Sequence, residues 1–256
     1  MESAFRRIKG LGREDLQAFV AENLPQLLED EALAVLENPH CTAAICGAVG
    51  QVPRLVAFYS VRVRLVAHRA TPQAHATKLV HYLRWTDLVR LSIEVTVPAP
   101  VRRAIDKQLL LNVEKLSLGE RIAAAKRCSQ ALIKVFLFDP DVKVLESLLV
   151  NQRLREDDVL LLVSSPRATP DQLALVASDR RWSFRYAVRK ALVLNPHTPR
   201  ASAARQLRFL ARRDVRDIHG RAETSVYLRR CIERLRPDDF PPERQPESGT
   251  RHPEGP

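Results

Sequence analysis

Apolar residues recur at helical spacing along most of the chain, and turn residues interrupt them at short intervals. Between residues 13 and 38, leucines follow a helical stripe on both sides of Pro25, which predicts two amphipathic helices. In the next long apolar segment, Val61, Val63 and Leu65 alternate with arginines, so a strand is an alternative to the predicted helix. The chain has eight glycines and no Asn-Gly or Asp-Gly pair, so hairpin turns are nearly absent and the pattern indicates an all-α protein.

Capping residues mark where several of the expected helices begin. Ser117 with Glu120, and Thr169 with Gln172, have the spacing of capping boxes, in which each side chain satisfies a free backbone N–H at a helix start. The apolar spacing predicts helices over residues 117–137, 139–151, 156–163, 169–177, 182–194, 199–213 and 223–236.

One short sequence is duplicated. Arg-Ala-Thr-Pro occurs at residues 69–72 and again at 167–170, and each copy precedes one of the two tryptophans, Trp85 and Trp182. The separation predicts an internal duplication of about 98 residues.

The matches extend outward to two predicted repeat units, residues 53–116 and 151–214. Within each unit, helix starts marked by proline recur about every 27 to 29 residues. One helical hairpin of this size cannot bury its own apolar face, whereas a stack of hairpins can. The sequence therefore predicts a right-handed α-solenoid of short helix pairs.

A family resemblance lies in the second unit. Residues 175–179, 184–188 and 195–199, which read Leu-Val-Ala-Ser-Asp, Phe-Arg-Tyr-Ala-Val and Asn-Pro-His-Thr-Pro, resemble the leucine-rich-repeat-variant motif, a HEAT-like helical repeat. The resemblance covers about a quarter of the chain closely and implies the fold, because the motif is a packing pattern. Some members of that family carry an N-terminal cysteine cluster for an iron–sulfur centre. Here only Cys41 and Cys46 lie close in sequence, too few for a four-thiolate site.

Charge is distributed unevenly along the single repeat domain that we expect over residues 1–236. The expected N-terminal cap, residues 13–38, is acidic, with seven acidic residues and no lysine or arginine from 14 to 37. Residues 179–236 hold sixteen Lys and Arg against five Asp and Glu. Residues 237–256 are rich in Pro, Glu, Gly and Ser, a composition that predicts a disordered tail.

Composition narrows the possible classes of protein. No apolar run approaches the roughly 20 residues that a membrane-spanning helix needs. The N-terminal residues contain no apolar segment of the kind found in signal peptides. With only four scattered cysteines, we expect a cytoplasmic protein with reduced thiols.

Two sets of arginines follow helical spacing in the basic region. They are Arg181, Arg185 and Arg189, and then Arg205, Arg208, Arg212 and Arg216. If each set lines one helix face, neighbouring helices place the two faces side by side. The nearby acidic residues are too few to neutralise them, which predicts an anion-binding surface. The alternative is an ordinary solvated surface.

The two tryptophans allow a structural and a functional interpretation. In the structural one, Trp85 and Trp182 pack between successive helix pairs. In the functional one, they form a stacking platform for bases or a peptide, and both belong to the predicted partner-binding residues. A base-processing enzyme could combine them with Asp87 and Arg185, although no spacing requires this.

The sequence contains no motif that predicts catalysis, a cofactor or a metal. It has no phosphate-binding glycine loop, no Gly-x-Ser-x-Gly and no His-Glu-x-x-His. Cys41, Cys46 and His40 are close in sequence, but small-residue packing accounts for the cysteines, so we expect no metal site.

These observations together predict a non-catalytic interaction scaffold. Its partner is an acidic protein or another polyanion, bound through the basic region at residues 179–236. A nucleic-acid-binding protein is the first alternative, and a DNA-base-processing enzyme of HEAT-like fold is the second. Because residues 14–37 and 179–236 carry opposite charge, head-to-tail self-association is a further expectation.

Overall fold

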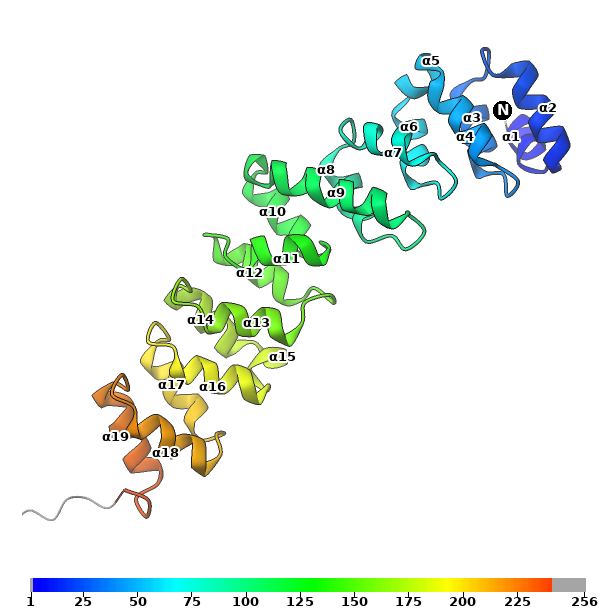
Figure 1. Ribbon diagram of the computed structural model, residues 1–256. Coiled ribbons are helices and arrows are strands. Elements are labelled where there is room, and N and C mark those ends of the chain that lie inside the picture. Colours follow the sequence, from blue (N-terminus) through cyan, green and yellow to red (C-terminus); the bar gives the residue numbers. More distant parts are fainter. Residues whose placement is uncertain (1, 241–256) are drawn as a thin grey trace, which may run out of the picture. The chain divides into compact units, whose positions relative to one another are not determined.

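The computed structural model describes residues 2–240, and residues 1 and 241–256 lie outside the description. Between residues 2 and 240 the chain forms nineteen α-helices and one 3₁₀ helix, without a strand (Figure 1). The all-α expectation is confirmed. Residues 59–67, where a strand was the alternative, are helical.

The described chain divides into two compact units, of which unit 1 ends at residue 158 and unit 2 begins at residue 159. Helix α13 (Glu156–Val163) crosses this boundary. The helices before it are α1 (Glu2–Lys9), α2 (Arg13–Asn23), α3 (Glu29–Glu37), α4 (Ala43–Gln51), α5 (Pro53–Ala57), α6 (Tyr59–Ala67), α7 (Gln73–Val80), α8 (Trp85–Ser92), α9 (Ala99–Asn112), η1 (Val113–Lys115), α10 (Leu118–Ala125), α11 (Gln130–Phe136) and α12 (Val142–Leu149). The helices after it are α14 (Pro170–Ser178), α15 (Arg180–Ser183), α16 (Tyr186–Leu194), α17 (Arg200–Leu207), α18 (Arg212–Gly220) and α19 (Val226–Leu235).

Helices within each unit pack mainly against helices close to them in sequence. In unit 1, α1 contacts α3, α3 contacts α6, α7 and α8 contact α9, and α10 contacts α12. In unit 2, α14 and α16 contact α17, and α17 and α18 contact α19. Short helices are marginal alone, so burial of each apolar stripe against such neighbours supplies their stability. None of the described helices is long and apolar enough to span a membrane.

The last helices of unit 2 surround a small core. Its buried side chains are Val193, Ala203, Leu207, Leu210, Val215, Ile218, Leu228 and Ile232. Phe240 packs against this core and its ring centroid lies 4.1 Å from that of His219. The predicted disordered tail therefore begins with described residues that contact unit 2, and the rest of it, residues 241–256, lies outside the described residues.

Both predicted capping boxes are present. The Ser117 hydroxyl accepts from the Glu120 N–H, and the Thr169 hydroxyl accepts from the Gln172 N–H. The Glu120 and Gln172 side chains in turn accept from the backbone N–H of Ser117 and Thr169. The capping motifs thus identified the starts of α10 and α14 correctly.

Three predicted helices were too long, because each breaks into two. Residues 117–137 form α10 and α11, residues 182–194 form α15 and α16, and residues 199–213 form α17 and the start of α18. The break before α18 contains no proline or glycine. It depends on a distant contact, because the backbone N–H of Ala211 donates to the Tyr186 hydroxyl at 3.1 Å. Side-chain contacts between helices override local helix propensity here.

Three buried asparagines hold the turns between helices in the same way. In each, Oδ1 accepts from the N–H two residues later, and Nδ2 donates to carbonyls of an earlier turn; they are Asn38, Asn151 and Asn195. For Asn195, Nδ2 lies 2.7 Å from the Val163 oxygen and 3.1 Å from the Ser165 oxygen. The asparagines thereby satisfy backbone groups that have no partner within a helix.

We expect Asn195→Ala to lower the free energy of unfolding of unit 2 by about 2 kcal/mol, since it leaves the Val163 and Ser165 carbonyls and the His197 N–H without their side-chain partner. Urea titration followed by circular dichroism measures the change. Ser178→Ala is the control, because the exposed Ser178 hydroxyl donates only within its own helix. Equal effects of the two substitutions would contradict the role of Asn195.

Candidate functional site

The arginines predicted to bind a partner do not form two continuous helix faces. Arg181 lies in α15, Arg185 is the N-cap of α16 and Arg189 lies in α16. In the second set, Arg205 lies in α17, Arg208 is its C-cap, and Arg212 and Arg216 lie in α18. The expectation of one face per set is wrong, because a helix break falls inside each set.

Two of these arginines instead combine with exposed aromatic rings. The guanidinium carbon of Arg189 lies 5.3 Å from the centroid of Phe184 and 4.3 Å from that of Phe209. The guanidinium carbon of Arg208 lies 4.8 Å from the Phe209 centroid. Phe184 is 70% exposed and Phe209 45% exposed. We name these four residues the arginine–aromatic cluster; its rings hold the cations at the surface of unit 2.

Arg212 and Arg216 already have an anionic partner within the chain. Both guanidinium groups bind the carboxylate of Asp239, and Arg212 Nε lies 2.7 Å and 2.8 Å from its two oxygens. Hydrogen bonds from Arg212 and then Arg216 hold the pKa of the Asp239 carboxyl well below its usual range. The same contact raises the pKa of Arg212. Asp239, at the C-terminal end of the described chain, therefore occupies part of the predicted anion-binding surface.

The tryptophans differ from each other in burial. Trp182 is 2% exposed, and the guanidinium carbon of Arg181 lies 4.4 Å from its ring centroid. This tryptophan is therefore a packing residue. Trp85 in unit 1 is half-buried and lines a groove of about 260 Å³. The other residues that line it are Leu83, Leu88, Gln108, Leu109, Asn112 and Leu116, none of which is a carboxylate. The Asp87 carboxylate accepts hydrogen bonds from Tyr59 and Arg90.

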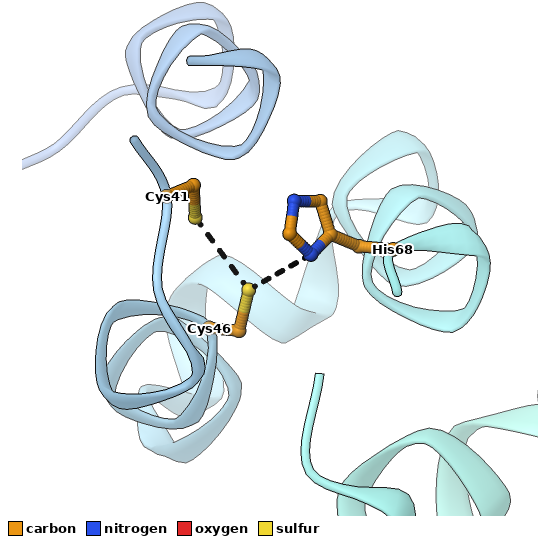
Figure 2. Close-up of side chains that lie close together, drawn as sticks. All are labelled: Cys41, Cys46 and His68. Carbon is orange, nitrogen blue, oxygen red and sulfur yellow. Dashed lines mark hydrogen bonds between the residues drawn. The ribbon is translucent and has the colours of Figure 1, made fainter. Parts of the chain in front are cut away.

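A cluster that sequence spacing did not predict lies in unit 1 (Figure 2). Cys41 follows α3, Cys46 lies in α4 and His68 is the C-cap of α6. The two sulfurs are 3.5 Å apart, and Cys46 Sγ is 3.3 Å from His68 Nδ1. Both cysteines are buried and the histidine is half-buried. His40, the histidine considered from sequence, is exposed.

The two thiols of this cluster are electrostatically different. The pKa of Cys46 is lowered to about 5, first because the Cys41 thiol donates to its sulfur and then because the His68 imidazole lies beside it, and burial opposes this effect. The pKa of Cys41 is raised, because its proton is held in that hydrogen bond and the side chain is buried. The pair thus combines a thiolate with a thiol that donates to it.

Comparison with known proteins identifies no relative. No family model matches the chain, and neither the curated proteins nor the solved structures contain a match.

Proposed function

We propose that this protein is a non-catalytic interaction scaffold whose helix pairs form a HEAT-like, right-handed solenoid. Unit 2 binds an anionic partner, an acidic protein, through its arginine-rich surface. The observation that carries the proposal is the arginine–aromatic cluster, in which exposed rings hold guanidinium groups in place.

Recurrent helix bounds support the repeat architecture. Adding 127 to the bounds of α4, α6 and α7 gives those of α14, α16 and α17. The helix bounds support an offset of 127 residues in place of the expected 98. With this offset, the two copies lie at residues 29–112 and 156–239. The two offsets differ by 29 residues, about one helix pair. In a repeat array each pair resembles its neighbours, so a sequence match can be one pair out of register.

Side-chain contacts recur at the same offset. The Tyr59 hydroxyl donates to Asp87 and accepts from the Arg84 N–H at 3.0 Å. In the second copy, the hydroxyl of Tyr186 donates to Asp214 and accepts from the N–H of Ala211 at 3.1 Å. Equivalent tyrosines therefore bridge equivalent helix breaks, which supports a common ancestor for the two copies.

The two copies differ most in their positive charge. At the positions equivalent to Arg212, Arg213 and Arg216, the first copy has Trp85, Thr86 and Val89. At the positions equivalent to Phe184 and Arg208 it has Ala57 and His81. Copies that share helix bounds but differ in surface charge support a binding role for unit 2 that the fold alone does not need.

Two kinds of partner suit such a surface. Arginine and aromatic residues dominate the energetic centres of protein interfaces, which favours an acidic protein. Nucleic acid is the second candidate, favoured by the exposed rings of Phe184 and Phe209, on which bases can stack beside cations.

Fluorescence anisotropy with labelled polyglutamate and labelled single-stranded DNA, each at increasing salt, tests the proposal. Polyglutamate that binds at low salt and is released as salt rises supports the protein partner. Tighter binding of DNA with a steep salt dependence supports the second candidate. If neither probe binds at low salt, the proposal is wrong.

We expect Asp239→Asn to raise the affinity for polyglutamate about threefold, because it releases Arg212 and Arg216 for the ligand. The pKa of Asp239 is lowered in the folded state, so its ion pairs with Arg212 and Arg216 are fully present above the usual carboxyl pKa. They are lost only when the pH falls through the lowered pKa of Asp239. Asp217→Asn is the matched control, since it removes the same charge from a pair with Arg221 alone. If both substitutions raise the affinity equally, the change in net charge explains the effect.

Head-to-tail self-association stays a prediction. It requires the acidic residues 14–37 of one copy to contact the basic residues 179–236 of another. Light scattering at low salt and rising concentration tests it, and a constant monomeric mass would exclude it.

A further inference from the structure

We propose that Cys41, Cys46 and His68 form a binding site for Zn²⁺ in unit 1. The three candidate ligand atoms all lie within 4.8 Å of one another (Figure 2). Two thiolates and an imidazole are ligands that Zn²⁺ prefers, and the fourth position is taken by water.

The distances suit tetrahedral coordination. Zn–S bonds of about 2.3 Å and Zn–N bonds of about 2.0 Å in a tetrahedron separate neighbouring ligand atoms by roughly 3.5 to 3.8 Å. The structure has 3.5 Å between the sulfurs and 3.3 Å between Cys46 Sγ and His68 Nδ1. The third pair, Cys41 Sγ and the His68 ring nitrogen, lies within 4.8 Å, so side-chain movements that bring all three atoms to the tetrahedral spacing are needed to receive the ion.

The second copy shows that packing at this turn needs neither sulfur nor imidazole. At the offset of 127 residues, Cys41 corresponds to Ala168, Cys46 to Leu173 and His68 to Asn195. All three of these residues are buried in unit 2. The Cys–His cluster is thus a feature of unit 1 beyond what the shared fold requires.

Histidine also departs from the asparagine pattern of the turns. Like the Oδ1 of Asn195, the Nδ1 of His68 accepts from the N–H two residues later, here that of Ala70 at 3.1 Å. In the tautomer that accepts from Ala70, this atom carries a lone pair, and it lies 3.3 Å from the Cys46 sulfur. A metal ion at the cluster competes with the Ala70 N–H for that lone pair, so the amide of Ala70 reports on binding.

Charge balance favours a divalent ion. Two thiolates and a neutral imidazole around Zn²⁺ leave no net charge, which suits side chains that are largely buried. The hydroxyl of Thr71 is buried beside the cluster without a hydrogen-bond partner. The hydroxyl of the equivalent Thr198 also lacks a partner, so the unpaired threonine is common to this turn in both copies and is not a sign of a metal site.

Titration of the reduced full-length protein with Co²⁺, a spectroscopic substitute for Zn²⁺, tests the site. We expect one Co²⁺ per chain, a thiolate-to-cobalt charge-transfer band, the visible absorption of tetrahedral cobalt and displacement by Zn²⁺. The Ala70 amide, followed by nuclear magnetic resonance, should shift on Zn²⁺ addition.

The matched variant takes its residues from the second copy. Cys41→Ala, Cys46→Leu and His68→Asn together should preserve the circular dichroism spectrum and abolish the charge-transfer band. Cys231→Ala, which removes a cysteine of unit 2, should keep the band. If the variant does not fold, Cys46→Ser alone should lose the band.

Three results would overturn the site: no charge-transfer band in the reduced wild type, a band that survives the triple or the single substitution, or an Ala70 amide that does not respond. The titration needs no anionic partner, so its outcome is independent of the proposed function.

Discussion

Reversing two charges in the arginine–aromatic cluster, by Arg189→Glu with Arg208→Glu, should weaken polyglutamate binding by at least about thirtyfold, or roughly 2 kcal/mol. Each substitution removes an attraction and adds a repulsion. The loss is concentrated here because the rings of Phe184 and Phe209, together with the Ser183 carbonyl that accepts from Arg189 Nε, hold the Arg189 guanidinium in place. A positioned cation loses less conformational entropy on binding than a mobile one. Fluorescence anisotropy at low salt measures the change.

The first copy provides the matched control for this experiment. Arg62 occupies the position equivalent to Arg189 and lies 5.4 Å from the ring centroid of Tyr59. We expect Arg62→Glu to weaken binding less than about threefold, because His81 stands where the second copy has Arg208. Arg189→Glu alone changes the net charge by the same amount as Arg62→Glu, and equal losses for these two single substitutions would show that binding depends on net charge and not on the cluster.

Truncating Ile232 should lower the free energy of unfolding of the C-terminal helices by about 2 to 5 kcal/mol. Its side chain is fully buried in the small core around α17, α18 and α19. Ile232→Ala removes apolar contacts and leaves a cavity that the short helices fill only in part. A loss of this size is a large fraction of the stability of a small domain.

The helices that lose stability after Ile232→Ala show whether unit 2 is an array of neighbouring helix pairs. Because α19 contacts α17 and α18, hydrogen–deuterium exchange should accelerate in these helices and change little in α14. Val226→Ala, on the same helix at a side chain that is 63% exposed, should leave exchange nearly unchanged. Equal acceleration throughout unit 2 would indicate one cooperative core instead of an array of neighbouring pairs.

Local sequence signals predicted the helix boundaries correctly where no contact with a distant residue sets the boundary. The capping residues Ser117 and Thr169 identified the starts of α10 and α14, and Pro25 separated α2 from α3. Helix breaks without proline or glycine were not predictable in this way. The break before α18 depends on Tyr186, 25 residues earlier in the chain.

Spacing along the chain was a weaker guide to the candidate sites. The arginine sets looked continuous because the breaks at Phe184 and near Phe209 carry helix-compatible residues. His68 lies 22 residues from Cys46, so no short motif could join it to the cysteines. Phe184 and the pair Arg208-Phe209 were visible in the sequence, but only the fold brings the rings of Phe184 and Phe209 to Arg189.

The place where polyglutamate binds decides whether the arginine–aromatic cluster is the binding site of unit 2. Hydrogen–deuterium exchange of the whole chain, with and without polyglutamate at low salt, locates the contact. We predict slower exchange at residues 183–190 and 205–210, around the arginine–aromatic cluster, and no change at the equivalent residues 56–63 of unit 1. Protection confined to unit 1, or binding without protection at the cluster, would contradict it.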